Sequence, residues 1–168
     1  MYNHQAVENA KLSARRAAER ARIFCKEQPV NFSNQPGTEI YGRVQDGNLN
    51  GECVFRLKSG ETYEGDVIAG QPHGFGVKTI PNGTMYEGEF RDGRPSGLGA
   101  TYINEQGAWV LYYAGTFVNG VPHGIGVSYS GMEVEFRNGK LNMDHLMEDR
   151  LKEDYEMTSF WDSLINDD

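Results

Sequence analysis

The chain has 168 residues, including 21 glycines, 9 tyrosines and 8 phenylalanines, and its formal charge is −8 at pH 7. This aromatic content argues against intrinsic disorder, and the glycines lack the triplet spacing of collagen. No apolar run reaches the ~20 residues of a membrane-spanning helix and the first residues lack the apolar stretch of a signal peptide, so we expect a soluble, cytoplasmic protein. Two cysteines, Cys25 and Cys53, are too few for a disulfide framework or a thiolate zinc site.

The charge divides the chain into three regions. Residues 1–39 carry +2, residues 40–140 carry −3 and residues 141–168 carry −7. We interpret them as an N-terminal helix with a linker, a repeat array, and an acidic C-terminal helix with a tail. Nucleic-acid-binding proteins show a basic surface over their folded part, whereas only residues 11–26 are basic here, so nucleic acid is not an expected partner.

Residues 4–27 predict a helix, because they are rich in alanine, arginine and glutamate. Small apolar residues recur there at alternating spacings of three and four and form a narrow seam: Val7, Ala10, Ala14, Ala17, Ala21 and Phe24. Such a seam favours a helix docked on the chain's own sheet, or else a solvated leader. Two alternatives stay open, namely pairing with another subunit and weak contact with anionic lipid through four arginines: Arg15, Arg16, Arg20 and Arg22.

Residues 40–140 contain a repeat with a period of 23 residues. The sequence YEGDV at residues 63–67 recurs as YEGEF at 86–90 and YAGTF at 113–117, and more faintly at 40–44 and 132–136. A turn glycine lies seven residues after the start of each copy: Gly47, Gly70, Gly93, Gly120 and Gly139. The first four units continue with a Gly-x-Gly segment, except that Cys53 replaces the second glycine in the first unit, and no such segment follows Phe136.

Each unit is predicted to form a hairpin of two strands. In the first strand Tyr63, Gly65 and Val67 alternate with two acidic residues, which is the period of a half-buried strand. The array therefore predicts an antiparallel meander of four full hairpins and one closing strand. Glycine weakens an ordinary strand, so we expect the repeated glycines to make room for tyrosine rings that lie across the sheet.

The pattern Tyr-Glu-Gly-x-Phe/Val-x-x-Gly, followed by Gly-x-Gly and repeated every 23 residues, resembles the MORN (membrane occupation and recognition nexus) repeat. The resemblance covers about residues 40–140. Copies that start at Tyr63 and Tyr86 match specifically. The first and last copies lack the opening tyrosine, and terminal repeats are commonly atypical. The resemblance implies an elongated, twisted single-layer sheet with an aromatic-lined groove, acting as a scaffold for other proteins. Some members of this family are linked to membranes or joined to lipid kinases or methyltransferases.

No arrangement of residues predicts catalysis, a cofactor or a metal site. His73 and His123 occupy the same place in the second and fourth units, roughly 19 Å apart, and cannot share a metal ion. Asn50 takes this place in the first unit, so we expect a polar side chain that binds turn backbone. The carboxylates of the first strands, such as Glu64 and Glu87, line the polar face, which we interpret as a solvated acidic face or a docking surface for a basic partner.

Residues 142–157 predict a second helix with a large side chain at every fourth position: Met143, Met147, Leu151 and Tyr155. We expect this helix to cap the end of the sheet. The tail, residues 158–168, places Phe160 and Trp161 with two aliphatic residues on one side of a predicted helix, as in helices that bind a partner's groove. Packing of the tail on the chain's own sheet and docking on a partner both stay open.

We therefore predict a mainly β, non-enzymatic scaffold that binds a partner protein through an aromatic-lined groove, through its flanking helices, or through both. The predicted partner-binding residues are Tyr63, Tyr86, Phe90, Tyr113, Phe117, Phe160 and Trp161. Two other functions remain: peripheral association with anionic lipid through the basic N-terminal helix, and service as an accessory subunit of an enzyme on another chain. The identity of the partner and the formation of a homodimer are left open.

Overall fold

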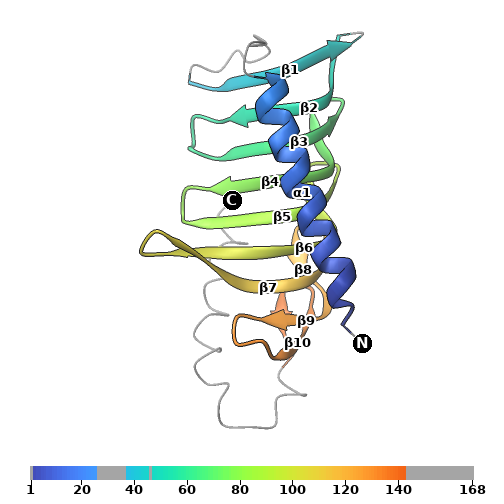
Figure 1. Ribbon diagram of the computed structural model, residues 1–168, viewed down its shortest axis with the longest axis vertical. Coiled ribbons are helices and arrows are strands. Elements are labelled where there is room, and N and C mark those ends of the chain that lie inside the picture. The colour runs from blue at the N-terminus through green and yellow to red at the C-terminus, as the bar shows by residue number, and fades with distance from the viewer. Residues whose placement is uncertain (1, 26–36, 46, 143–168) are drawn as a thin grey trace.

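The computed structural model describes residues 2–25, 37–45 and 47–142, which form one helix and one antiparallel sheet (Figure 1). The helix predicted over residues 142–157, apart from its first residue, lies outside the described residues. So does the tail with Phe160 and Trp161.

Helix α1 runs from His4 to Cys25. It begins at a cap, because the Asn3 side-chain oxygen accepts a hydrogen bond of 3.1 Å from the Ala6 amide. Its predicted seam is confirmed, with these residues buried: Val7, Ala10, Ala14, Ala17, Ala18, Ala21 and Cys25. Phe24 is half-buried at the end of the seam, where the Arg43 guanidinium lies 5.0 Å from its ring centroid.

The strands lie across the sheet in the order in which they occur in the sequence. Its strands are β1 (Glu39–Gln45), β2 (Asn48–Arg56), β3 (Thr62–Ile68), β4 (Gln71–Ile80), β5 (Thr84–Arg91), β6 (Arg94–Glu105), β7 (Ala108–Val118), β8 (Val121–Pro122), β9 (Gly124–Ser128), β10 (Glu133–Arg137) and β11 (Lys140–Leu141). Strands pair in sequence order, with β8 and β9 both paired to β7. This confirms the predicted open sheet of consecutive hairpins. The expected closing strand, β10, differs from the prediction in that the two-residue strand β11 follows and pairs with it.

Within each unit a tight turn connects the first strand to the second, and these turns lie along one rim of the sheet. In four of these turns both central residues have positive φ, for example Ala69 (50°) with Gly70 (79°), which is the type I′ geometry that suits the twist of a hairpin. In each of these four turns the glycine amide donates a hydrogen bond to a carbonyl of the preceding unit, as Gly70 does to Leu49 at 2.9 Å and Gly93 does to Pro72 at 2.9 Å. The turns therefore tie each unit to the one before it.

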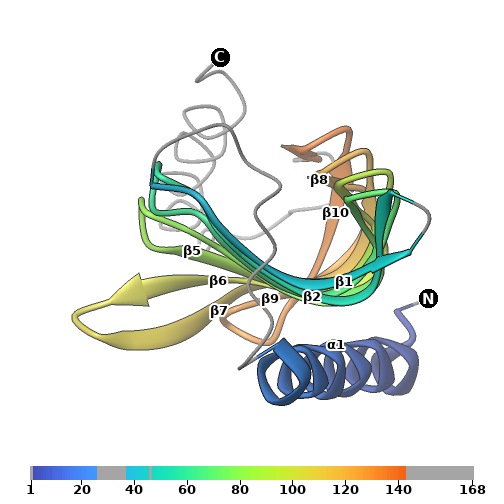
Figure 2. The ribbon, with the colours of Figure 1, turned by 90° about the horizontal axis from the view of Figure 1, so that it is seen from above.

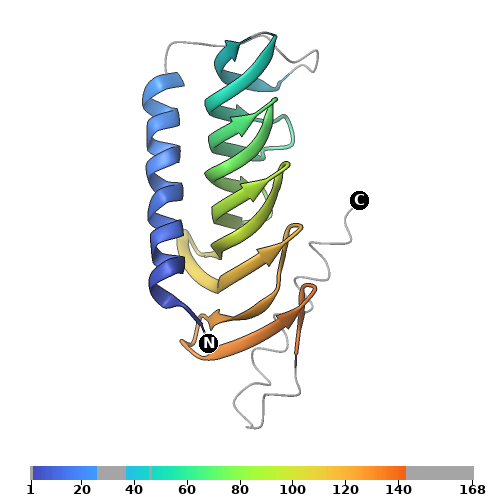
Figure 3. The ribbon, with the colours of Figure 1, turned by 90° about the vertical axis from the view of Figure 1, so that its right-hand side faces the viewer.

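The sheet is bent into a trough, and α1 lies along its convex side (Figures 2 and 3). Glycines stand directly opposite one another across the strands, in a row that includes Gly65, Gly76, Gly88 and Gly99. The register shifts immediately after Gly65 in β3 and after Gly88 in β5. Irregularities of this kind bend a strand, so the trough follows from the repeated glycines.

Tyrosine rings fill the concave side over these glycines. A Cβ atom added at Gly76 would lie 2.6 Å from a ring carbon of Tyr63, so the predicted packing role of the glycines is confirmed. The Tyr63 hydroxyl donates a hydrogen bond of 2.6 Å to the Asp66 carbonyl, and Tyr86 repeats the contact with Glu89 at 2.9 Å. The tyrosines alternate with phenylalanines in edge-to-face contacts, with centroids 4.8–5.5 Å apart.

The first unit fills the same space with a cysteine. It has Ile40 in place of the tyrosine, and Cys53 in place of the second glycine, so no ring needs room there. The Cys53 side chain lies over Gly42 instead and is fully buried. This burial raises the pKa of the Cys53 thiol to about 12. The departure from the repeat therefore preserves the packing of the concave side.

Candidate functional site

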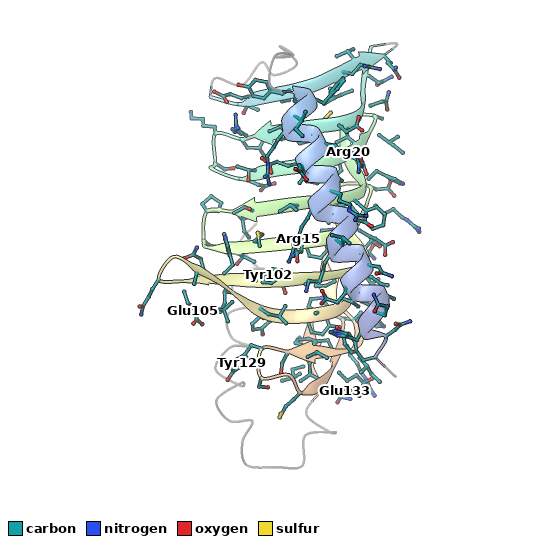
Figure 4. The ribbon with its side chains drawn as sticks, viewed as in Figure 1. Arg15, Arg20, Tyr102, Glu105, Tyr129 and Glu133 are labelled. Carbon is teal, nitrogen blue, oxygen red and sulfur yellow. The ribbon has the colours of Figure 1, made fainter. Side chains whose placement is uncertain are left out.

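The convex face holds a buried ion pair beneath α1. Glu87, on β5, has a side chain that is only 3% exposed. Arg15 of the helix donates two hydrogen bonds to its carboxylate, from Nε to Oε2 at 2.7 Å and from a terminal nitrogen to Oε1 at 2.6 Å. The Tyr102 hydroxyl of β6 donates a third to the same carboxylate. Arg15 and Tyr102 approach this point from the helix and from the sheet (Figure 4).

Two further arginines bind carboxylates of the same face. Arg22 donates a hydrogen bond of 2.6 Å to Glu64, and Arg20 lies 3.5 Å from both Glu52 and Asp66. Seven residues of helix advance about 10.5 Å, which matches the ~9.6 Å between strands that are one repeat unit apart. The step from Arg15 to Arg22 therefore fits the step from Glu87 to Glu64.

These contacts bear on two sets of predictions, those for the acidic face and those for the N-terminal helix. The solvated acidic face is wrong for Glu87, because α1 covers this carboxylate and supplies the arginine that neutralises it. The basic partner is the chain's own helix. Three of the four arginines considered for lipid contact bind the sheet, and only Arg16 is left without an ion pair among the described residues.

The five predicted sheet aromatics lie together on the concave face. Tyr63, Tyr86, Phe90, Tyr113 and Phe117 belong to one apolar cluster, and each is at most 4% exposed. They pack mainly against one another and leave little surface for a direct contact. Burial raises the pKa of the three tyrosines far above its ordinary value of 10.0, so they stay neutral even well above physiological pH. These rings are the floor of the trough.

A cavity of about 460 Å³ opens on this floor near β1–β4. Its apolar wall comes from Ile40, Leu49, Phe55, Leu57 and Tyr63. Turn residues border the cavity at one rim. At the other rim it is bordered by an ion pair, in which Lys78 Nζ lies 3.0 Å from Glu61 Oε1. A volume of this size falls in the range of small-ligand pockets.

Comparison with known families settles what the array is. The family model of the MORN repeat matches residues 63–85, 86–101 and 113–131. The chain is a MORN repeat protein. The matched segments contain the tyrosine and Gly-x-Gly positions that form the floor of the trough. A search of curated protein sequences gives no significant match.

The two repeat histidines of this MORN repeat protein, His73 and His123, have structural partners. His123 Nδ1 accepts a hydrogen bond of 3.4 Å from the Asn138 amide, and Asn50 Oδ1 accepts one of 2.9 Å from the Ala69 amide in the equivalent turn. The expected bond from a polar side chain to turn backbone is thus confirmed at these two positions. His73 lies 3.7 Å from the Asp92 carboxylate. In the part of the chain that the structure describes, no three metal-ligating side chains gather and no helix could span a bilayer.

Sequence reasoning missed the residues that give the MORN trough its accessible surface. Leu57 and Glu61 lie in the connection between β2 and β3, and Lys78 lies near the end of β4. The repeat pattern is weakest in these places. Of the seven predicted partner-binding residues, Tyr63 is the one named among the residues lining the cavity, and Phe160 and Trp161 fall outside the described residues. Leu57 could have been predicted, because it is the one apolar residue in the polar connection over residues 57–61. An apolar side chain in a loop often packs against the protein or contacts a ligand.

Proposed function

We propose that the chain is a non-enzymatic scaffold that binds a segment of a partner protein in the concave trough. MORN repeats are commonly interaction modules for proteins or membranes, and they are generally not enzymes. The observation that supports this proposal is the cavity of about 460 Å³ beside Phe55 and Tyr63, on the face that α1 leaves uncovered. An apolar side chain of the partner would enter this cavity, and the buried aromatic floor would hold its shape.

The alternative of lipid binding has less support from the contacts of α1. Anionic lipid would have to compete with Glu87 and Glu64 for Arg15 and Arg22, whose nitrogens already lie 2.6–2.7 Å from carboxylate oxygens. Flotation with vesicles of anionic phospholipid measures this directly. Salt-sensitive binding of the intact chain would favour the lipid function over the scaffold.

Service as an accessory subunit of an enzyme is one form of the same proposal. In that case the captured partner would itself carry catalytic activity. Assays of the purified complex, once the partner is identified by mass spectrometry, distinguish an enzyme from another kind of protein.

The experiment that tests the proposal compares affinity purifications with two matched variants. Leu57→Gln changes a cavity residue that is 36% exposed, and Ile125→Gln changes a residue of similar exposure, 42%, on the convex side. We expect a partner that is retained by the wild type and by Ile125→Gln and is lost from Leu57→Gln. Equal retention by all three would contradict a partner site in the cavity.

A further inference from the structure

The outward side of α1 carries a stripe of exposed residues, opposite its alanine seam. The stripe has the spacing of a helix-pairing surface: Gln5, Asn9, Leu12, Arg16, Glu19 and Ile23. Leu12 is 46% exposed and Ile23 is 66% exposed, the largest value among the exposed large hydrophobics of the described residues. Arg16 and Glu19 are exposed and form no ion pair in the part of the chain that the structure describes.

The centre of this stripe is complementary to itself. If two α1 helices pack antiparallel about a two-fold axis that passes between Arg16 and Glu19, then Arg16 of each copy faces Glu19 of the other. In the same register, Leu12 of each copy faces Ile23 of the other. The contact is isologous, with two ion pairs at its centre and an apolar pair on either side. We propose that the chain forms a homodimer through this α1–α1 contact.

The neighbouring charges do not oppose this contact. Arg15, Arg20 and Arg22 flank the stripe, and carboxylates of the chain's own sheet neutralise them. Among the described residues of α1, Arg16 is therefore the arginine that has no ion pair, and Glu19 is the carboxylate that has none. The helix also lies outside the convex face over most of the trough's length, so two copies can meet along it without contact between their sheets (Figures 2 and 3).

The contact is small, so the dimer is weak. Leu12 and Ile23 are eleven residues apart, which spans about 17 Å of helix. Two helix segments of this length in contact bury an area well below the ~1,600 Å² of standard stable complexes. The two troughs would open away from each other. A weak dimer would thus present two concave cavities and could bind a divalent partner more tightly than a monomer does.

Sedimentation equilibrium of the full chain at low salt, from about 10 µM to 1 mM, tests the proposal through a charge exchange. Arg16→Glu places glutamates opposite each other twice and should weaken dimerisation at least about tenfold, because the like charges repel across the contact. Glu19→Arg should do the same. The double variant Arg16→Glu with Glu19→Arg restores both pairs with reversed polarity and should return dimerisation to within about twofold of the wild type.

Arg91→Glu serves as the matched control, because this exposed residue at the end of β5 changes the net charge equally and lies outside α1. It should dimerise like the wild type. Circular dichroism tests whether each variant is folded. We expect that each is, because arginine and glutamate are both good helix formers. A wild type that stays monomeric up to 1 mM would overturn the proposal. So would a double variant that fails to recover, or single variants that dimerise as well as the wild type.

Discussion

The Glu87 carboxylate offers a sharp test of how α1 is held on the sheet. Its side chain is 3% exposed, whereas that of Arg15 is 59% exposed. Removing the arginine, as in Arg15→Met, leaves a buried charge with the Tyr102 hydroxyl as its remaining partner among the contacts described above. Removing the charge, as in Glu87→Gln, leaves an arginine that can turn to water. The two halves of one ion pair should therefore differ in their effect on stability.

The expected magnitudes follow from this asymmetry. Breaking a buried pair by removing one partner costs about 3–5 kcal/mol. Because water still reaches Arg15, we expect Arg15→Met to lower the free energy of unfolding by about 2–3 kcal/mol after discounting for solvent screening. Glu87→Gln keeps the shape and should cost about 1–1.5 kcal/mol. The double variant leaves no unpaired buried charge, so it should cost about as much as Glu87→Gln alone, about 1–1.5 kcal/mol.

Urea unfolding followed by circular dichroism measures these changes as shifts of the midpoint at constant slope. The matched control is Arg22→Met, which breaks a hydrogen bond of equal length, 2.6 Å, to the more solvated Glu64. We expect that variant to cost less than about 1 kcal/mol. The reasoning is refuted if Arg15→Met costs no more than Arg22→Met, or if the effects of Arg15→Met and Glu87→Gln simply add in the double variant.

Three further predictions concern buried residues of the sheet and of α1. Gly76→Ala should destabilise the protein by about 1–3 kcal/mol, because its methyl group would collide with the Tyr63 ring, and in a Tyr63→Leu background the same change should cost much less. Alkaline unfolding should begin above pH 10: the folded state keeps raised pKa values on four buried tyrosines while the unfolded state ionises, so each tyrosine removes about 1.4 kcal/mol of stability per pH unit. A spectrophotometric titration in which all nine tyrosines of the folded protein form phenolate near pH 10 would contradict this for Tyr63, Tyr86, Tyr102 and Tyr113. Burial also raises the pKa of both thiols, so Cys25 and Cys53 should react with a disulfide reagent near neutral pH only after denaturation, and rapid reaction of either in the folded chain would be inconsistent with the structure.

The repeat made most of the sheet predictable. Tyr63, Gly65 and Val67 alternate with acidic residues, and the same pattern one period later fixes which residues share a face. The small size of glycine explains why Gly76 and Gly99 accompany Tyr63 and Tyr86, since each ring occupies the space of a missing side chain. Local patterns of this kind depend on the nearest strands alone, and the sequence contains those strands in order.

It was harder to predict which face of the sheet α1 would cover. A strand pattern shows that Glu87 and Tyr86 lie on opposite faces, but it does not show which face a distant helix covers. The match between seven helical residues and one repeat unit was a usable signal, because Arg15 and Arg22 have the spacing of Glu87 and Glu64. The near-complete burial of the aromatic floor could not be predicted either, because it depends on how strongly the whole sheet bends.

A photo-reactive side chain placed at Leu57 tests the central claim of a partner site in the concave trough most directly. Leu57 is 36% exposed at the cavity, and the same side chain at Ile125, 42% exposed on the convex side, is the control. We predict that Leu57 crosslinks to one short segment of a partner protein, that a synthetic peptide of that segment suppresses the crosslink, and that Ile125 does not form it. Crosslinks to the partner from Ile125 but not from Leu57 would contradict the account.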